Sequence, residues 1–180
     1  MAELNPRVFS DLSYGLYIVS SMRADRPNAQ LVNTVIQVTS APPRIAVILN
    51  TRNLTHEYVS ESRLFGVTVL SEDAPLAFFG PFGFRTGRDY DKFGPGVDWK
   101  RGAATGVPLV TGHALSVLEA RVIDTIALGT HTIFVADALS SEVLREGRPL
   151  TYHYYREHLK GKSSPNAPTY VAPSAGAKGA

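Results

Sequence analysis

One stretch, residues 33–56, constrains the fold of this chain more than any other. Its sequence, NTVIQVTSAPPRIAVILNTRNLTH, begins with side chains that alternate in character, meets Pro42-Pro43, and continues with an apolar, β-branched run. Alternation with a period of two is typical of a strand, and two prolines end a hydrogen-bonded ladder. The apolar run fits a strand buried on both faces. We therefore predict strands over residues 32–39 and 45–49, joined by a tight turn and followed by a helix over residues 54–62.

Neutral polar side chains gather where these two predicted strands end. Backbone N–H groups in the first turn of a helix lack partners and the helix dipole is positive there, so a phosphate is stabilised at such a place. Neutral donors and acceptors also suit the nitrogen and oxygen atoms of a small-molecule ligand. The alternative is that these groups only end two strands and cap a helix. The residues concerned are Asn33, Thr34, Gln37, Thr39, Asn50, Thr51, Asn53 and Thr55.

The rest of the chain predicts an antiparallel barrel. A brief helix over residues 74–80 leads into a Gly- and Pro-rich loop, residues 81–96, which is too long to be only a connector. We expect one domain over residues 1–160 and an extended C-terminal segment over 161–180, with the last ~10 residues mobile because of their composition. Short apolar runs bounded by turn residues predict further strands over 16–21, 65–70, 115–125 and 132–136, with residues 23–29 as a hairpin loop.

Composition excludes several classes of function. A chain of 180 residues with 44% hydrophobic and 19% charged residues suits one globular domain, and its net charge of +2 is spread along the sequence, which argues against nucleic-acid or membrane binding. The absence of cysteine excludes disulfides, Cys nucleophiles and a rubredoxin-type iron site, and the histidines lack companions at metal-ligand spacing. There is neither a P-loop nor a Rossmann glycine motif. With no basic-then-apolar leader, we expect a soluble cytoplasmic protein.

Five ordered motifs carry a resemblance to a known family. They are N-T-V-x-Q-V-T-S-x-P-P, I-L-N-x-x-N-x-T-H, T-G-R-D-x-D-K-F, G-x-H-T-I-F-V and T-Y-x-Y-Y. Together they resemble the flavin reductase-like FMN-binding split-barrel family, over residues 7–170, and within it flavoredoxin and the flavin domain of high-molecular-weight rubredoxin. The resemblance implies a mainly β protein with short helices, folded as a split β-barrel, and a homodimer.

The resemblance also implies a cofactor and its site. FMN would be held by neutral side chains at the strand ends, and residues 86–93 would close over the flavin or the partner subunit, although a solvated charged turn is the alternative. His131 would lie near the flavin ring as the candidate catalytic residue; otherwise it is an ordinary loop histidine. Tyr152, Tyr154 and Tyr155 are expected to be core or dimer-interface aromatics. The implied FMN-binding residues are Asn33, Thr34, Val35, Gln37, Val38, Thr39, Asn50, Thr51, Asn53, Thr55, Arg88 and Lys92.

Two functions follow from this reasoning. The first is an oxidoreductase that accepts hydride from NADH or NADPH onto FMN and passes electrons to a separate acceptor, such as another redox protein. The second is an FMN-containing electron carrier that reacts poorly with nicotinamides. A split barrel that binds another cofactor, or only a partner protein, is a third interpretation.

Overall fold

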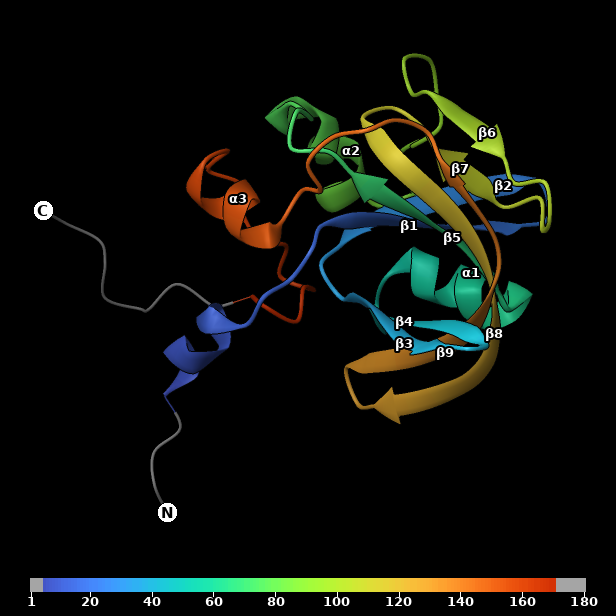
Figure 1. The fold of residues 1–180 in the computed structure, drawn as a ribbon, viewed down its shortest axis with the longest axis horizontal. Coiled ribbons are helices and arrows are strands. Elements are labelled where there is room, and N and C mark those ends of the chain that lie inside the picture. The colour runs from blue at the N-terminus through green and yellow to red at the C-terminus, as the bar shows by residue number, and fades with distance from the viewer. Residues whose placement is uncertain (1–4, 171–180) are drawn as a thin grey trace, which may run out of the picture.

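The computed structural model describes residues 5–170, and a curved seven-stranded antiparallel sheet forms the framework of this part of the chain (Figure 1). Its strands lie in the order β2-β1-β5-β8-β9-β4-β3, and a separate two-stranded sheet pairs β6 (Trp99–Arg101) with β7 (Pro108–Val110). The seven strands are β1 (Tyr17–Arg23), β2 (Arg26–Val32), β3 (Val35–Ser40), β4 (Pro43–Asn50), β5 (Leu64–Leu70), β8 (Ala114–Leu128) and β9 (His131–Val143). The prediction of a mainly β split barrel is confirmed.

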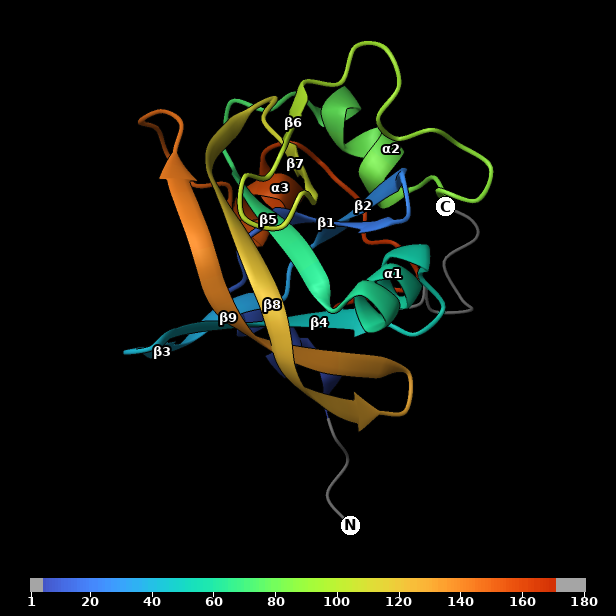
Figure 2. The same cartoon turned by 90° about the vertical axis from the view of Figure 1, so that its right-hand side faces the viewer.

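Short helices cover the ends and faces of this sheet. The helix α1 (Leu54–Ser62) packs against β1, β2 and β4, and Figures 1 and 2 show it between the layer containing β1 and the layer containing β4. The remaining helices are η1 (Pro6–Asp11), η2 (Leu76–Phe79), α2 (Gly80–Gly83) and α3 (Tyr152–Glu157). In the described part of the chain, none of these helices has the length and apolar character needed to cross a membrane.

The barrel is split because its two edge strands are β2 and β3. These strands follow one another in the sequence, and the chain passes from one edge to the other through Asn33 and Thr34. Thr34 is bonded to β4 twice, since its carbonyl oxygen accepts from the Ile48 N–H at 3.1 Å and its hydroxyl donates to the Ile48 carbonyl oxygen at 3.0 Å. The link is therefore attached to the β4 side, and the β2 edge is left open toward α1.

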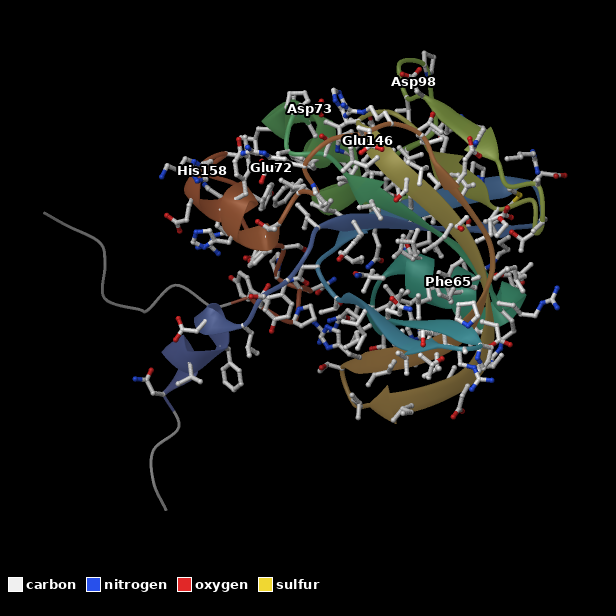
Figure 3. All side chains as sticks on the ribbon, in the orientation of Figure 1. Phe65, Glu72, Asp73, Asp98, Glu146 and His158 are labelled. Carbon is white, nitrogen blue, oxygen red and sulfur yellow. The ribbon has the colours of Figure 1, made fainter. Side chains whose placement is uncertain are left out.

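Apolar side chains pack on both faces of the central strands. Val19 of β1 belongs to the core inside the barrel, whereas its neighbour Ile18 packs into a second core with Phe79 and Tyr155. This division follows from the alternation of side chains along a strand. Phe65, fully buried, lies among the strands of the first core, while the labelled charged residues Asp73, Asp98 and Glu146 lie around the periphery (Figure 3).

Most predicted elements agree with the structure, and two need correction. The helix over residues 54–62 is confirmed, and the predicted strands correspond to β1, β4, β5, β8 and β9, of which β8 and β9 extend further. The single strand predicted over residues 32–39 is wrong, because Asn33 and Thr34 interrupt it. The hairpin loop predicted over residues 23–29 is also wrong, since Arg23 pairs with Arg26 and only Ala24 and Asp25 form the turn. The mobility predicted for the final residues concerns a segment outside the described residues.

A buried carboxylate joins β8 to the loop after β6. Glu119 is 2% exposed and accepts hydrogen bonds from the backbone N–H groups of Ala104 and Thr105 and from the hydroxyls of Thr105 and Ser140, at 2.6–3.1 Å. Burial by itself would raise the pKa of Glu119, but these hydrogen bonds outweigh it and hold the pKa below its ordinary value. The carboxylate is therefore fully bonded in its charged form.

We expect Glu119→Gln to lower the free energy of unfolding by about 1.5–3 kcal/mol at neutral pH, because hydrogen bonds to charged groups contribute about that much. Because the pKa of native Glu119 is lowered, the advantage of wild type over the variant should be lost as the pH falls through that pKa. Urea unfolding at several pH values measures both effects. Glu142→Gln, which removes an exposed ion pair with Lys100, should cost less than about 1 kcal/mol. Equal losses in the two variants would contradict the argument.

Candidate functional site

A cleft of about 300 Å³ lies beside the open β2 edge. Its walls come from β2, the link at Asn33 and Thr34, the end of β4, the start of α1, the loop after α2, α3 and the C-terminal residues 162–168. The cleft therefore gathers residues from both sides of the split and from segments far apart in the sequence. Its polar lining residues include Asn28, Gln30, Asn33, Thr34, Asn50, Arg52, Asn53, Thr55, Thr86, Lys92, Tyr152, Tyr155, Ser163, Ser164 and Asn166.

The cleft brings together only part of the predicted site. Asn33, Thr34, Asn50, Asn53, Thr55 and Lys92 line it. Val35 and Gln37 instead line a second hollow of about 320 Å³, between the β3–β4 hairpin and the faces of β1, β5 and β8. The cause is the interruption at Asn33 and Thr34, after which β3 runs away from the cleft along β4. Val38, Thr39, Thr51, Arg88 and His131 also lie outside the lining of the cleft. The binding roles of all these residues stay predictions.

Several predicted ligands are already bonded within the protein. The Thr55 hydroxyl, 1% exposed, accepts a hydrogen bond from Asn28 Nδ2 at 2.8 Å. Asn53 is the N-cap residue of α1 but makes no side-chain cap bond; its Oδ1 accepts from Asn166 Nδ2 at 2.8 Å. Asn50 Oδ1 accepts from the Arg52 N–H at 2.9 Å. These contacts position the side chains and limit which of their atoms are free for a ligand.

Two residues on β2 were missed by the sequence reasoning. Asn28 and Gln30 are 2% and 8% exposed, line the cleft, and keep the side-chain oxygens Oδ1 and Oε1 buried without a hydrogen-bond partner among the described residues. A buried polar group without a partner costs about 1–3 kcal/mol, and both residues line one cleft, so we expect a ligand there to supply the missing hydrogen bonds. The alternation of Asn28, Gln30 and Val32 was the available signal, and the assignment of residues 23–29 to a loop concealed it.

Lys92 supplies a buried positive charge to the same cleft. Its side chain, 5% exposed, donates from Nζ to the Ala29 carbonyl oxygen at 2.7 Å and forms no ion pair in the described part of the chain. Burial without a carboxylate partner lowers the pKa of Lys92 to about 8. Arg88, another cation of this loop, is paired with Glu57 on α1. Among the cations of the loop, Lys92 is the buried one, and an anion is the ligand that would compensate its charge.

His131 lies at the start of β9, and both of its ring nitrogens have partners. Nε2 is 3.3 Å from the Asn166 carbonyl oxygen, and Nδ1 is 2.9 Å from the Thr130 hydroxyl. A carbonyl oxygen can only accept, so Nε2 carries the proton and Nδ1 accepts from Thr130. Asn50 Nδ2 lies 3.5 Å from the same Nε2, but both nitrogens are donors in this tautomer, so no hydrogen bond joins them. His131 thus touches residues that line the cleft without lining it itself, and its catalytic role stays a prediction.

Comparison with known proteins assigns this architecture to a family. The family described as "Flavin reductase like domain" matches residues 9–162, and the chain belongs to it. The ferric-chelate reductase (NAD(P)H) of Archaeoglobus fulgidus is 47% identical over 167 residues, which cover 93% of this chain and 98% of that protein. The high molecular weight rubredoxin of Moorella thermoacetica is 41% identical over 168 residues, covering 93% and 72%. The solved structure of flavoredoxin from Methanosarcina acetivorans superposes with a TM-score of 0.70 at 22% identity, covering 83% and 80%, which supports the fold alone.

The groups present in the cleft fit a flavin nucleotide. A phosphate is an anion that Lys92 can pair with, and it offers no donor to an amide oxygen. The ring system of a flavin has an imide edge with one N–H donor between two carbonyl acceptors, which matches the free amide of Gln30 in either orientation of its oxygen and nitrogen. Within residues 5–170, no three His, Asp or Glu side chains lie close enough together to hold a metal ion.

Lys92 should give the binding of an anionic ligand a characteristic pH dependence. Because Lys92 in the ligand-free protein loses its proton above about pH 8, the affinity for FMN should fall by up to about tenfold per pH unit above that value. The dissociation constant, measured by fluorescence titration between about pH 6 and pH 10, tests this. Lys92→Met should weaken binding at neutral pH and abolish the slope, whereas Lys100→Met, an exposed control paired with Glu142, should keep it.

Lys92→Met should stabilise the ligand-free protein. The pKa of folded Lys92 is below the value of 10.5 for an unperturbed lysine, so the unfolded chain binds more protons between about pH 8 and pH 10.5. Stability of the wild type should therefore rise with pH through that window. At neutral pH, Lys92→Met should raise the melting temperature of the ligand-free protein. A lower melting temperature together with unchanged FMN affinity would show that Lys92 is only structural.

Proposed function

We propose that this protein is a flavin-dependent oxidoreductase that binds FMN in the cleft beside β2 and uses NADH or NADPH as electron donor. One observation on residues 5–170 carries the proposal. In one cleft of a flavin reductase-like fold, the buried ammonium group of Lys92 has no ion-pair partner among these residues, and two buried amide oxygens have no hydrogen-bond partner among them. The relative named ferric-chelate reductase (NAD(P)H) supports the nicotinamide donor. FMN has both groups that the cleft calls for, an anionic end and an imide edge.

The side chains of the cleft bind and orient; they do not carry out the redox chemistry. A bound flavin supplies hydride acceptance from a reduced nicotinamide and onward transfer of electrons. Lys92 would hold the phosphate, and Gln30 and Asn28 would accept hydrogen bonds from ligand donors. Asn53 and Thr34 provide further polar groups at the mouth of the split. The positive charge of Lys92 would also favour an anionic form of the reduced ligand.

We propose further that the protein is a homodimer and delivers its electrons to a separate acceptor molecule. Ile36 and Val38 on the edge strand β3 are 60% and 47% exposed, a concentration of apolar surface on an unpaired strand that supports contact with a second subunit. Val35 and Gln37, predicted as FMN-binding residues, lie on this same strand.

The second candidate function is an FMN-containing electron carrier. The 41% identity to a high molecular weight rubredoxin favours it, because that name denotes a redox protein. Anaerobic stopped-flow mixing of the FMN-loaded protein with NADH or NADPH separates the two functions. Rapid bleaching of the flavin absorbance by either nucleotide identifies a reductase. Bleaching by dithionite but by neither nucleotide identifies a carrier, and failure to retain or bind FMN refutes both.

A pair of glutamine variants tests where the ligand lies. We expect Gln30→Leu to weaken FMN binding by about 1–3 kcal/mol, because the variant cannot accept or donate hydrogen bonds in the cleft. Gln37→Leu is the matched comparison, since the motif resemblance assigns Gln37 to the site while the structure places it on β3 outside the cleft. Fluorescence titration of both variants shows which of the two glutamines contributes to FMN binding. A loss confined to Gln37→Leu would show that the cleft beside β2 is not the flavin site.

A further inference from the structure

The segment after α3 turns back and forms one wall of the cleft. We call residues 162–169 the C-terminal strap. Residues 162–168 line the cleft, opposite lining residues from β2 and from the start of α1. The family match ends at residue 162, so nearly the whole strap lies beyond the part of the chain that defines the family.

Hydrogen bonds attach the strap to the two sides of the split. Asn166 Nδ2 donates to Asn53 Oδ1 at 2.8 Å, which joins the strap to the N-cap of α1. Asn33 Nδ2 donates to the Thr169 hydroxyl at 2.9 Å, which joins it to the link between β2 and β3. The Tyr155 hydroxyl donates to the Lys162 carbonyl oxygen at 3.2 Å, which holds its beginning against α3. The strap is thus attached to α3, to the N-cap of α1 and to the β2–β3 link.

Asn166 also joins the strap to β9. Its carbonyl oxygen accepts from His131 Nε2 at 3.3 Å, and the Thr130 hydroxyl holds the other side of the ring in the matching tautomer. Asn166 therefore contacts two of the residues singled out by the sequence motifs, Asn53 through its side chain and His131 through its backbone. His131 is therefore one of the residues that attach the strap to the sheet.

The attachment is polar and can open at small cost. No residue of the strap is fully buried; Lys162, Pro165 and Pro168 are exposed and the others are half-buried. Its internal order comes from two backbone turns, Ala167 N–H to Ser164 O at 2.9 Å and Tyr170 N–H to Ala167 O at 3.0 Å. Ser163 adds hydrogen bonds with the Tyr152 hydroxyl and the Arg156 guanidinium. A segment held by side-chain hydrogen bonds, with no fully buried residue, opens more readily than the sheet to which it is attached.

We propose that the C-terminal strap is the wall of the cleft that retains bound flavin, with Asn166 as its positioning residue and His131 as one of its anchors. The proposal rests on the proposed function, since it names what keeps the flavin in that site. Flavin release requires the Asn53–Asn166 and Asn33–Thr169 hydrogen bonds to part. The strap therefore makes FMN a retained group rather than a substrate that exchanges on every turnover.

The rate of flavin release tests the proposal in the full chain. Protein loaded with FMN is mixed with an excess of a flavin-scavenging protein, and flavin fluorescence reports release. The double variant Asn166→Ala/Thr169→Val should release FMN faster, by about fivefold for each of the two hydrogen bonds removed. Thr125→Val, the same substitution at an exposed position of β8, is the matched control and should release FMN at the wild-type rate. Thermal unfolding of the ligand-free proteins verifies that all variants are folded.

His131→Ala tests the anchoring role by itself. Because it removes one contact of the strap, it should raise the rate of FMN release above the wild-type value. A wild-type release rate in His131→Ala would overturn the anchoring role. Wild-type release rates in the double variant would overturn the retention role of the strap. If the wild-type chain binds no FMN at all, the proposed function and the retention role of the strap both fail. Loading the wild-type protein with FMN shows this before any variant is measured.

Discussion

The whole site depends on a break in backbone pairing at Asn33 and Thr34. The chain leaves one edge of the sheet at Val32 and enters the opposite edge at Val35, so the two edges cannot close on each other. Thr34 is hydrogen-bonded to Ile48 on β4, which attaches the link between β2 and β3 to the β4 side of the split. The β2 edge consequently remains available to α1, to Lys92 and to the residues of the cleft. A continuous strand through this position would have filled the space that the cleft occupies.

The cleft carries groups that are unfavourable in the absence of a ligand. In the part of the chain that the structure describes, the buried charge of Lys92 has only a carbonyl oxygen as partner, and the buried amide oxygens of Asn28 and Gln30 have no donor. Glu119 differs from them, because its buried carboxylate is fully hydrogen-bonded. Unsatisfied polar groups that lie together are typical of a binding site that is already formed before its ligand binds. The binding energy of the ligand then includes the relief of these costs.

Sequence reasoning succeeded where the pattern is local. The helix over residues 54–62 and the buried strand before it follow from apolar periodicity and a polar N-terminus. It failed at β2, because Arg26, Pro27 and Asn28 have the composition of a turn while their pairing with β1 makes them a strand. That error removed Asn28 and Gln30 from consideration, although both face the cleft. The family resemblance could place Lys92 and Arg88 in the same loop, but it could not reveal that Arg88 is already paired with Glu57.

The sequence by itself determined the class of the molecule: alternating and apolar runs, the prolines at 42 and 43 and the ordered motifs are sufficient for a split barrel of the flavin reductase-like family. Only the tertiary structure decided which polar residues share a cleft. Asn28, Lys92 and Asn166 are separated by more than sixty residues at each step, and nothing in their local sequence relates them. Their proximity arises from long-range strand pairing and from the return of the chain after α3. The unpaired charge and amides become energetically costly only because burial removes water as their partner.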